Sequence, residues 1–302
     1  MAVKQNRILI FGAGVIGSIY AMKFMEAGID VTMFARSNRF KALKEKGLQY
    51  NEKGAVKSIK VKVIDKLEND DIYDFIFVTV RYDKSKSALL ALKDNQSKNI
   101  VTMSSNSSGF STWLDIVGDR LLPAFPGAGG QIKDGILYAR IPLKGIVPTV
   151  FGEISGLVTE RLENLGKLFK SAKLSYAINK DMKGYLVTHS VWDIALLGAL
   201  YFGNKTTDEK TAKTGKKAHK ITITLKAYLR AIQKAGVAIN PAVYKIMLKC
   251  PSPILDFLFT LWLRSKMVKD MMLPDYANSA NNEVEMLNKD LLKFLSQKGV
   301  TI

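Results

Sequence analysis

The first half of the chain alternates short apolar runs with segments of helical pattern. The apolar runs are continuous and rich in β-branched residues, which is typical of strands covered on both faces. They lie at residues 8–11, 31–35, 75–80 and 100–103. Apolar positions at helical spacing occupy the segments between them, at residues 15–27, 40–46 and 84–93. This alternation predicts a doubly wound parallel sheet of the Rossmann type.

The pattern changes after the middle of the chain. Residues 149–153 and 174–178 predict two further strands on either side of a helix at 160–171. Apolar residues then recur at three- and four-residue spacing in the segments 182–201, 217–235, 241–249, 254–269 and 281–297. The polar, lysine-rich stretch 204–220 predicts a loop that leads into a solvated first turn. We therefore expect an α/β Rossmann-type domain over residues 1–179 and an all-α domain over residues 180–302.

The composition indicates a soluble globular protein, because 47% of the 302 residues are hydrophobic and 24% are charged. A disordered or fibrous chain is excluded. Cys250 is the only cysteine, and His189 and His219 are the only histidines. These counts exclude a disulfide-stapled secreted scaffold and a structural zinc site, so we expect no metal.

The chain offers no targeting or membrane signal. The apolar stretch at 8–11 is broken at once by glycines and is too short for a signal peptide. The longest late apolar run, 254–263, is interrupted by Asp256 and closed by Arg264, well under the roughly 20 residues of a membrane span. We expect a cytoplasmic protein without a membrane partner, in which this run forms a buried or interface helix of a homodimer.

The net charge is unusually positive for a soluble protein: 45 basic and 27 acidic residues give +18. Nucleic acid, anionic lipid, or an anionic cofactor and substrate are the partners that such a surplus fits. No nucleic-acid reader motif or interleaved aromatic and basic stretch is present, so we expect no nucleic acid. Much of the surplus lies in the lysines at 205, 210, 213, 216, 217 and 220, which read as a solvated surface.

A glycine-rich turn follows the first predicted strand and opens a helix. It has the pattern G-x-G-x-x-G and consists of Gly12, Ala13, Gly14, Val15, Ile16 and Gly17. The first glycine allows a tight turn, the second lets a pyrophosphate approach the backbone, and the third lets helix and strand pack closely. A helix N-terminus then offers free N–H groups to phosphate. The position of the turn predicts a dinucleotide site, although glycine-rich turns also occur for purely structural reasons.

The end of the second strand favours NADP(H). Enzymes that use NAD usually place an acidic residue there, whereas an arginine accommodates a 2′-phosphate. Residues 34–39 contain no acid and offer Arg36, with Ser37 and Arg39 beside it. A guanidinium matches phosphate in a bidentate manner, and the alternative is a solvated arginine.

These features resemble the ketopantoate reductase (2-dehydropantoate 2-reductase) family over essentially the whole chain. Further similarities are Arg81, where the family has a lysine near the nicotinamide, and residues 104–109, a variant of its Gln-Asn-Gly turn. In that turn Asn106 is the best match to the asparagine that contacts cofactor and substrate, with Ser105 as the alternative. Residues 265–270 and 282–288 are similar to its Ser-Ser-Met-x-x-Asp and Thr-Glu-Ile-Asp-x-x-Asn motifs.

The resemblance implies NADPH-dependent reduction of a small anionic 2-keto acid in a cleft between the two domains, within pantothenate biosynthesis. It implies a helical domain like the C-terminal domain of 6-phosphogluconate dehydrogenase. Glu283 takes the place of the glutamate that faces the active cleft, and Lys266 that of a substrate-binding serine.

The chain departs from the family where the proton-donating lysine and two substrate-binding asparagines are expected. Those positions hold Tyr185, His189 and Asp193. Lys183 is two residues from the lysine position, about 200° around a helix, and does not share its face. This variant resembles a divergent branch of the family.

Spacing of four residues places Tyr185, His189 and Asp193 on one helix face. An Asp–His pair orients an imidazole and keeps it protonated near neutral pH, which makes His189 a candidate proton donor, with Tyr185 the second and Asp193 a substrate ligand. The alternative is that His189 is a hydrogen-bonded core residue. The functional alternative is a catalytically weakened NADP(H)-binding sensor or regulatory protein.

Overall fold

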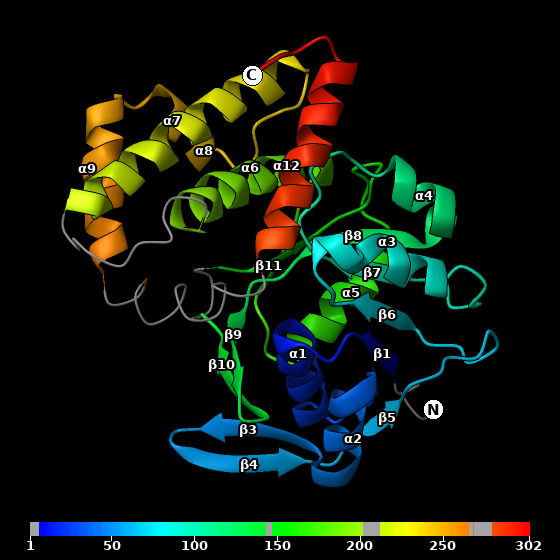
Figure 1. Cartoon of the computed structure of the whole chain (residues 1–302). Helices are drawn as coiled ribbons and strands as arrows, with labels where there is room; N and C mark the ends of the chain where they lie inside the picture. Colours follow the sequence, from blue (N-terminus) through cyan, green and yellow to red (C-terminus); the bar gives the residue numbers. More distant parts are fainter. Residues whose placement is uncertain (1–5, 143–146, 202–211, 266–267, 269–279) are drawn as a thin grey trace. The chain divides into compact units, whose positions relative to one another are not determined.

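The computed structural model describes residues 6–142, 147–201, 212–265, 268 and 280–302 (Figure 1). The chain divides into two compact units. One comprises Met1–Ser104 and Ser111–Met182, and the other comprises Ser105–Phe110 and Lys183–Ile302. The short segment 105–110 therefore groups with the helical unit, although it directly follows a strand of the first unit in the chain.

The first unit is built on an eight-stranded sheet with the order β12-β11-β8-β7-β6-β1-β2-β5. Its strands are β1 (Arg7–Phe11), β2 (Asp30–Phe34), β5 (Lys62–Ile64), β6 (Phe75–Val78), β7 (Ile100–Met103), β8 (Leu121–Phe125), β11 (Thr149–Phe151) and β12 (Tyr176–Ile178). All neighbours pair in parallel except β11 and β8, which are antiparallel. The parallel α/β sheet followed by a helical region is confirmed. Because β1 lies between β2 and β6, the register sets Phe11 opposite both Phe34 and Val78 at the carboxyl ends.

Helices flank this sheet and complete a core of aliphatic side chains with a group of aromatic rings. They are α1 (Val15–Glu26), α2 (Ser37–Lys46), α3 (Tyr82–Ala91), α4 (Ser111–Val117) and α5 (Glu160–Ser171), with a single 3-10 turn at Gly118–Arg120. Phe24 of α1 packs between Phe77 and Phe169, with ring centroids 5.2 and 5.8 Å away. Burial of these rings fixes α1 on the sheet, and with it the turn that precedes α1.

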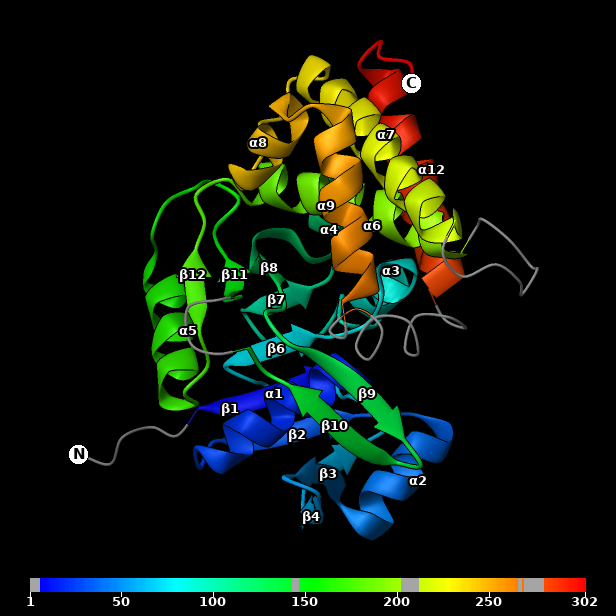
Figure 2. The same cartoon turned by 90° about the vertical axis from the view of Figure 1, so that its left-hand side faces the viewer.

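A second sheet in the first unit was not predicted from the sequence. It has the order β4-β3-β10-β9 and joins two hairpins, β3 (Leu48–Glu52) with β4 (Ala55–Ile59) and β9 (Gly129–Lys133) with β10 (Ile136–Arg140) (Figure 2). The hairpins meet through parallel pairing of Leu137 with Tyr50. Strand β4 is exposed along most of its length, so it lacks the apolar run by which the other strands were predicted.

The second unit is helical over its described residues. Its helices are α6 (Met182–Tyr201), α7 (Ala212–Lys234), α8 (Val243–Lys249), α9 (Ser252–Arg264) and α12 (Ala280–Gln297), and α7 packs against α9. The predicted loop is wrong over residues 212–216, because α7 begins at Ala212 and not at the predicted residue 217. Ala218 and Ile221 are buried while Lys216 and Lys220 are exposed, so this segment is an amphipathic helix.

Helix α9 ends at Arg264, because Ser265 adopts extended backbone angles, and the predicted extension to residue 269 is wrong at Ser265. Leu255, Phe259 and Leu263 are buried on one face of α9. A stripe on its other face is exposed and consists of Ile254, Phe257, Leu258 and Leu261. None of the described helices combines the length and the apolar character that crossing a membrane requires. The homodimer stays a prediction.

Candidate functional site

The glycine turn connects β1 to α1, and two of its glycines are fixed by close contacts within the protein. Gly12 has φ +123°, and a Cβ there would lie 3.0 Å from the carbonyl oxygen of Thr79. A Cβ on Gly17 would lie 1.9 Å from the Gly12 carbonyl oxygen. The Thr79 hydroxyl donates a 2.7 Å hydrogen bond to that same oxygen. The turn is thus held against the end of β6 by contacts that exclude side chains at both positions.

Gly14 differs from these two glycines, because a Cβ there would meet no atom within 4 Å. Its φ of −76° is available to any residue. Gly14 is also the N-cap of α1, where no side chain caps the helix and the first turn contains no acid. The space over Gly14 and the start of α1 therefore suits an anion bound to backbone N–H groups.

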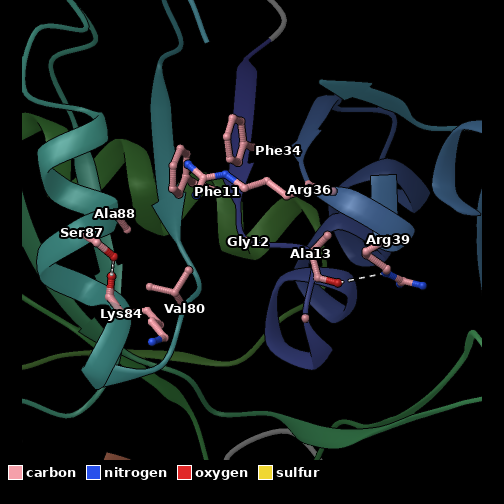
Figure 3. Close-up of a pocket in the computed structure, with 12 residues that line it drawn as sticks. Phe11, Gly12, Ala13, Phe34, Arg36, Arg39, Val80, Lys84, Ser87 and Ala88 are labelled. Carbon is pink, nitrogen blue, oxygen red and sulfur yellow. Dashed lines mark hydrogen bonds between the residues drawn. The ribbon is translucent and has the colours of Figure 1, made fainter. Parts of the chain in front are cut away.

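A pocket of about 490 Å³ opens above this turn, at the carboxyl ends of β1, β2 and β6 (Figure 3). Its lining residues come from these strand ends and the positions directly after them, from the glycine turn, and from α2 and α3. They are Phe11, Gly12, Ala13, Gly14, Phe34, Ala35, Arg36, Arg39, Val80, Lys84, Ser87 and Ala88. This is where doubly wound sheets bind their ligands, and the glycine turn fits the pyrophosphate of a dinucleotide.

Arg36 lies over an aromatic pair at the edge of this pocket. The rings of Phe11 and Phe34 stack with centroids 4.3 Å apart, and the Arg36 guanidinium lies 5.3 Å from the centre of the Phe34 ring (Figure 3). The Arg36 side chain is exposed, and none of the described residues that line the pocket is acidic. The next residue, Ser37, has φ 52°, in the left-handed region. The strand end thus presents a cation where an acid would bind a ribose hydroxyl.

Arg39 also lines the pocket, but its side chain is held by hydrogen bonds within the protein. Its guanidinium donates hydrogen bonds to the carbonyl oxygens of Ala13 (3.0 Å) and Gly135 (3.3 Å) and to the Ser18 hydroxyl (3.1 Å). Partial burial lowers the pKa of Arg39. Figure 3 shows the bond to Ala13. Arg39 therefore ties the glycine turn to the β9–β10 turn instead of projecting freely toward a phosphate.

The sequence reasoning missed the contribution of α3 to the pocket. Lys84, Ser87 and Ala88 line it, and the available signal was that α3 follows β6, the strand beside β1. Arg81, by contrast, is not among the lining residues. It is the N-cap of α3, and its Nε lies 3.4 Å from a carboxylate oxygen of Asp83.

A polar cluster lies in the second unit, on one face of α6. The rings of Tyr185 and His189 stack with centroids 6.2 Å apart, and His189 Nε2 lies 3.7 Å from Asp193 Oδ1. The Ser105 hydroxyl donates a 2.5 Å hydrogen bond to Asp193 Oδ2. We call Ser105, Tyr185, His189 and Asp193 the α6 cluster. Its members on α6 are the three residues that the sequence placed on one face.

The protonation states in the α6 cluster differ from the expectation. Burial lowers the pKa of His189 to about 4, so the expectation of a protonated imidazole near neutral pH was wrong. Burial raises the pKa of Asp193 to about 7, although the hydrogen bond from Ser105 opposes the rise. Burial and the charge of Asp193 also raise the pKa of Tyr185. In this apolar surrounding the neutral form of each group is favoured.

Asn106 and Ser105 were alternative matches to one family position, and the structure gives them different surroundings. Asn106 is 1% exposed, and its carbonyl accepts a 3.1 Å hydrogen bond from the backbone N–H of Ser108. Within the described part of the chain, its amide nitrogen and the Ser107 hydroxyl lack a hydrogen-bond partner. Buried polar atoms without a partner are uncommon in native proteins, and a bound ligand is one group that satisfies them.

The remaining predicted site residues are Glu283 and Lys266. Glu283 is half-buried in the first turn of α12. The Lys183 ammonium lies over the ring of Phe294, 5.5 Å from its centre. Lys266 lies outside the described residues. Across the ranges that the structure describes, no group of three histidine, cysteine or acidic side chains is arranged to hold a metal.

The sequence has measurable similarity to known proteins. Residues 8–110 match the family described as Ketopantoate reductase PanE/ApbA. A 2-dehydropantoate 2-reductase of Archaeoglobus fulgidus is 25% identical over 197 residues. That match covers 65% of this chain and 62% of the relative, so it spans less than two thirds of the relative's length.

Solved structures extend the similarity of fold to nearly the whole chain. A PanE/ApbA family ketopantoate reductase from Ralstonia eutropha JMP134 superposes with a TM-score of 0.69 at 16% identity, covering 98% of this chain and 93% of that one. D-mandelate dehydrogenase in complex with NADH gives a TM-score of 0.70 at 14% identity, with the same coverage. Residues 8–110 are therefore similar to the ketopantoate reductase PanE/ApbA family, and the chain as a whole shares its fold with solved structures that include a ketopantoate reductase.

Proposed function

We propose that this protein is a nicotinamide-dinucleotide-dependent reductase of a small 2-keto acid. The observation that carries the proposal is the pocket at the ends of β1 and β2, where Gly14 leaves space over the start of α1 and Arg36 lies exposed at its edge. Backbone N–H groups at a helix start and a nearby guanidinium are the donors that a dinucleotide phosphate requires. The family match of residues 8–110 supports the same reading.

NADP(H) is the cofactor that we propose, with Gly12, Gly14, Gly17 and the start of α1 at the pyrophosphate and Arg36 at the 2′-phosphate. The competing cofactor is NAD(H), since the structurally similar D-mandelate dehydrogenase is described in complex with NADH. The absence of an acid among the pocket's lining residues favours NADP(H). Arg81, Lys266 and Asn106 stay predicted contacts to cofactor or substrate.

The reaction needs a hydride at the carbonyl carbon and one proton at the carbonyl oxygen of the substrate. When bound, the dinucleotide supplies a hydride to the carbonyl carbon, and the carbonyl oxygen then takes a proton from the protein. The α6 cluster contains the candidate proton donors. Glu283 is a further candidate catalytic residue, and we expect it to contact the substrate. A cation near the substrate carboxylate would stabilise its charge, and Lys266 is the proposed residue.

A panel of 2-keto acids, including 2-dehydropantoate, tests this function through the loss of NADPH or NADH absorbance. We expect turnover with at least one small keto acid and a higher kcat/KM with NADPH than with NADH. Turnover with none of them, while the cofactor still binds, would contradict the reductase. The Gly14→Ala variant serves as the cofactor-site control.

A second candidate function rests on the prediction that Tyr185 occupies the position of the family's proton-donating lysine. A protein that binds NADP(H) without fast turnover would act as a sensor of the cofactor's redox state. Such a sensor would bind NADPH and NADP⁺ with clearly different affinities and show no turnover in the same panel. A reductase in pantothenate synthesis would instead turn over 2-dehydropantoate.

A further inference from the structure

The Ser105 hydroxyl and the Asp193 carboxyl are the two members of the α6 cluster joined by a hydrogen bond, 2.5 Å long. His189 lies 3.7 Å from the other carboxyl oxygen, beyond hydrogen-bond distance. We propose that Asp193 holds the proton that is delivered to the substrate oxygen, and that Ser105 is the positioning residue that fixes this carboxyl. The proposal rests on the proposed reductase function and assigns the proton donor within it.

The geometry favours Asp193 over His189. One oxygen of Asp193 is fixed by Ser105, so the other oxygen is left to carry and present a proton. His189 has its ring stacked with Tyr185. The side chains of Asp193 and His189 keep 23% and 20% of their surface exposed, so a small substrate and water can still reach the carboxyl.

The surroundings of Asp193 favour its protonated form up to about neutral pH. His189 and Tyr185 face it from α6, Ser105 from the segment 105–110, and the Tyr244 ring of α8 lies close enough for the Asp193 charge to affect it. No described lysine or arginine forms an ion pair with Asp193. Burial therefore raises the pKa of Asp193 to about 7, whereas it lowers the pKa of His189 to about 4. A donor with a pKa near the working pH is the most effective one.

The proton transfer balances with the proposed hydride transfer. A hydride from the reduced nicotinamide forms the new C–H bond at carbon 2 of the keto acid, and the carbonyl π electrons move to oxygen. That oxygen takes the proton from Asp193, which leaves a hydroxy acid, the oxidised nicotinamide and an Asp193 carboxylate. The Ser105 hydroxyl donates to this carboxylate, and a proton from solvent restores the acid.

The first test is an infrared titration of the cofactor-free protein. The carboxylic acid C=O band of Asp193, identified by its loss in Asp193→Asn, is expected to disappear as the pH rises through about 7. Because the Ser105 hydrogen bond stabilises the charged form, Ser105→Ala should move this transition upward by about one pH unit. Ser190→Ala is the matched control, since Ser190 is equally buried on α6 but donates to the Leu186 carbonyl. Ser190→Ala should leave the pH of the Asp193 transition unchanged.

The second test is the pH profile of kcat with a keto acid that is turned over. Since the acid form is required, the rate should fall as the pH rises through the Asp193 pKa, and this fall should move upward in Ser105→Ala. Asp193→Asn should lower kcat by about 100-fold or more and remove the fall. Asp256→Asn, which alters a carboxylate paired with His219 elsewhere in the same unit, should leave the profile unchanged.

Failure of this assignment is distinguishable from failure of the proposed function. Turnover of keto acids without a neutral titration of Asp193, or a Ser105→Ala variant that leaves both transitions in place, would overturn the assignment alone. A normal titration of Asp193 in a protein that turns over no keto acid would overturn the reductase function, and the donor role with it.

Discussion

Ser105 and Asp193 are separated by 88 positions in the chain, and the Ser105 hydroxyl donates a 2.5 Å hydrogen bond to Asp193 Oδ2. The contact joins the segment that follows β7 to the middle of α6 within the helical unit. It gives a role to Ser105, which the sequence offered only as the alternative to Asn106. The polar face of α6 thus has a defined partner, which spacing along the helix alone does not supply.

His189 is expected to modulate the reaction without being the acid. Because burial holds the pKa of His189 at about 4, the imidazole is neutral over the usual assay range. His189→Gln should lower kcat by less than Asp193→Asn does, and the fall in rate near pH 7 should persist. Loss of that fall in His189→Gln would identify His189 as the titrating group. The pH profile of kcat for the two variants decides between them.

Arg36 is expected to select the cofactor. Arg36→Ala removes the cation at the pocket edge, so affinity for NADPH should fall about 10-fold to 100-fold, the value of a hydrogen-bonded charge pair. Affinity for NADH should change little, since it lacks the 2′-phosphate. Quenching of tryptophan fluorescence measures both. Equal losses of affinity for the two cofactors would remove the argument for NADP(H). Arg230→Ala, which alters an exposed arginine of α7, is the control.

Arg39 is expected to behave differently from Arg36. Its hydrogen bonds to Ala13, Gly135 and Ser18 hold the glycine turn in place. Arg39→Ala should therefore lower Tm and reduce the affinities for NADPH and NADH by the same factor. Thermal unfolding and the two binding titrations measure these effects. A loss confined to NADPH at unchanged Tm would mean that Arg39 contacts the 2′-phosphate after all.

The glycines of the turn are expected to separate binding from stability. A Cβ at Gly14 meets no protein atom, so Gly14→Ala should leave Tm nearly unchanged while weakening both dinucleotides. A Cβ at Gly17 would overlap the Gly12 carbonyl oxygen, so Gly17→Ala should cost about 1–3 kcal/mol of unfolding free energy or more. Chemical denaturation and cofactor titration distinguish the two. Full cofactor affinity in a folded Gly14→Ala protein would contradict the placement of the pyrophosphate.

A buried ion pair in the first unit predicts a pH dependence of stability. Burial acts to raise the pKa of Glu153, but hydrogen bonds from Arg161 and Thr159 outweigh it and hold that pKa below its usual range. A lowered pKa stabilises the fold above the unfolded value of about 4.3, and this contribution is lost as the pH falls through the folded value. Glu153→Gln should therefore cost about 3 kcal/mol at pH 7.

This difference from the wild-type protein should shrink as the solution is acidified below the unfolded pKa of Glu153. Urea unfolding of both proteins at neutral and acidic pH measures it. A constant difference at every pH would mean that the loss comes from packing. Glu160→Gln, which alters an exposed residue in the first turn of α5, should show no comparable dependence.

Much of the fold could be predicted because the buried strands of the large sheet are short, continuous apolar runs. Strands β1, β2, β6 and β7 are buried over nearly all their residues, so their pattern is unambiguous. The second sheet could not be predicted, because its strand β4 is mostly exposed and polar. Likewise, the first turns of α7 are rich in lysine, and their apolar face becomes visible only once Ala218 and Ile221 are known to be buried.

The candidate site was only partly accessible to sequence reasoning. The glycine turn could be predicted, because its residue types follow from local backbone geometry. The difference between Arg36 and Arg39 could not be predicted from the sequence, because it depends on the position of the β9–β10 turn that binds Arg39. The protonation states of the α6 cluster could not be predicted either, because the desolvation of His189 and Asp193 arises from the packing around α6. A pairing of histidine and aspartate in the sequence alone predicted the opposite state for His189.

The transfer of hydride from a bound nicotinamide to the carbonyl carbon of a 2-keto acid is the central claim, and isotope transfer measures it directly. The protein would be incubated with a keto acid that it turns over and with NADPH carrying deuterium at the carbon that gives up hydride. Mass spectrometry of the product is expected to show a 2-hydroxy acid with one deuterium on carbon 2, formed in step with NADP⁺. A product without deuterium, or oxidation of NADPH without any hydroxy acid, would contradict the account.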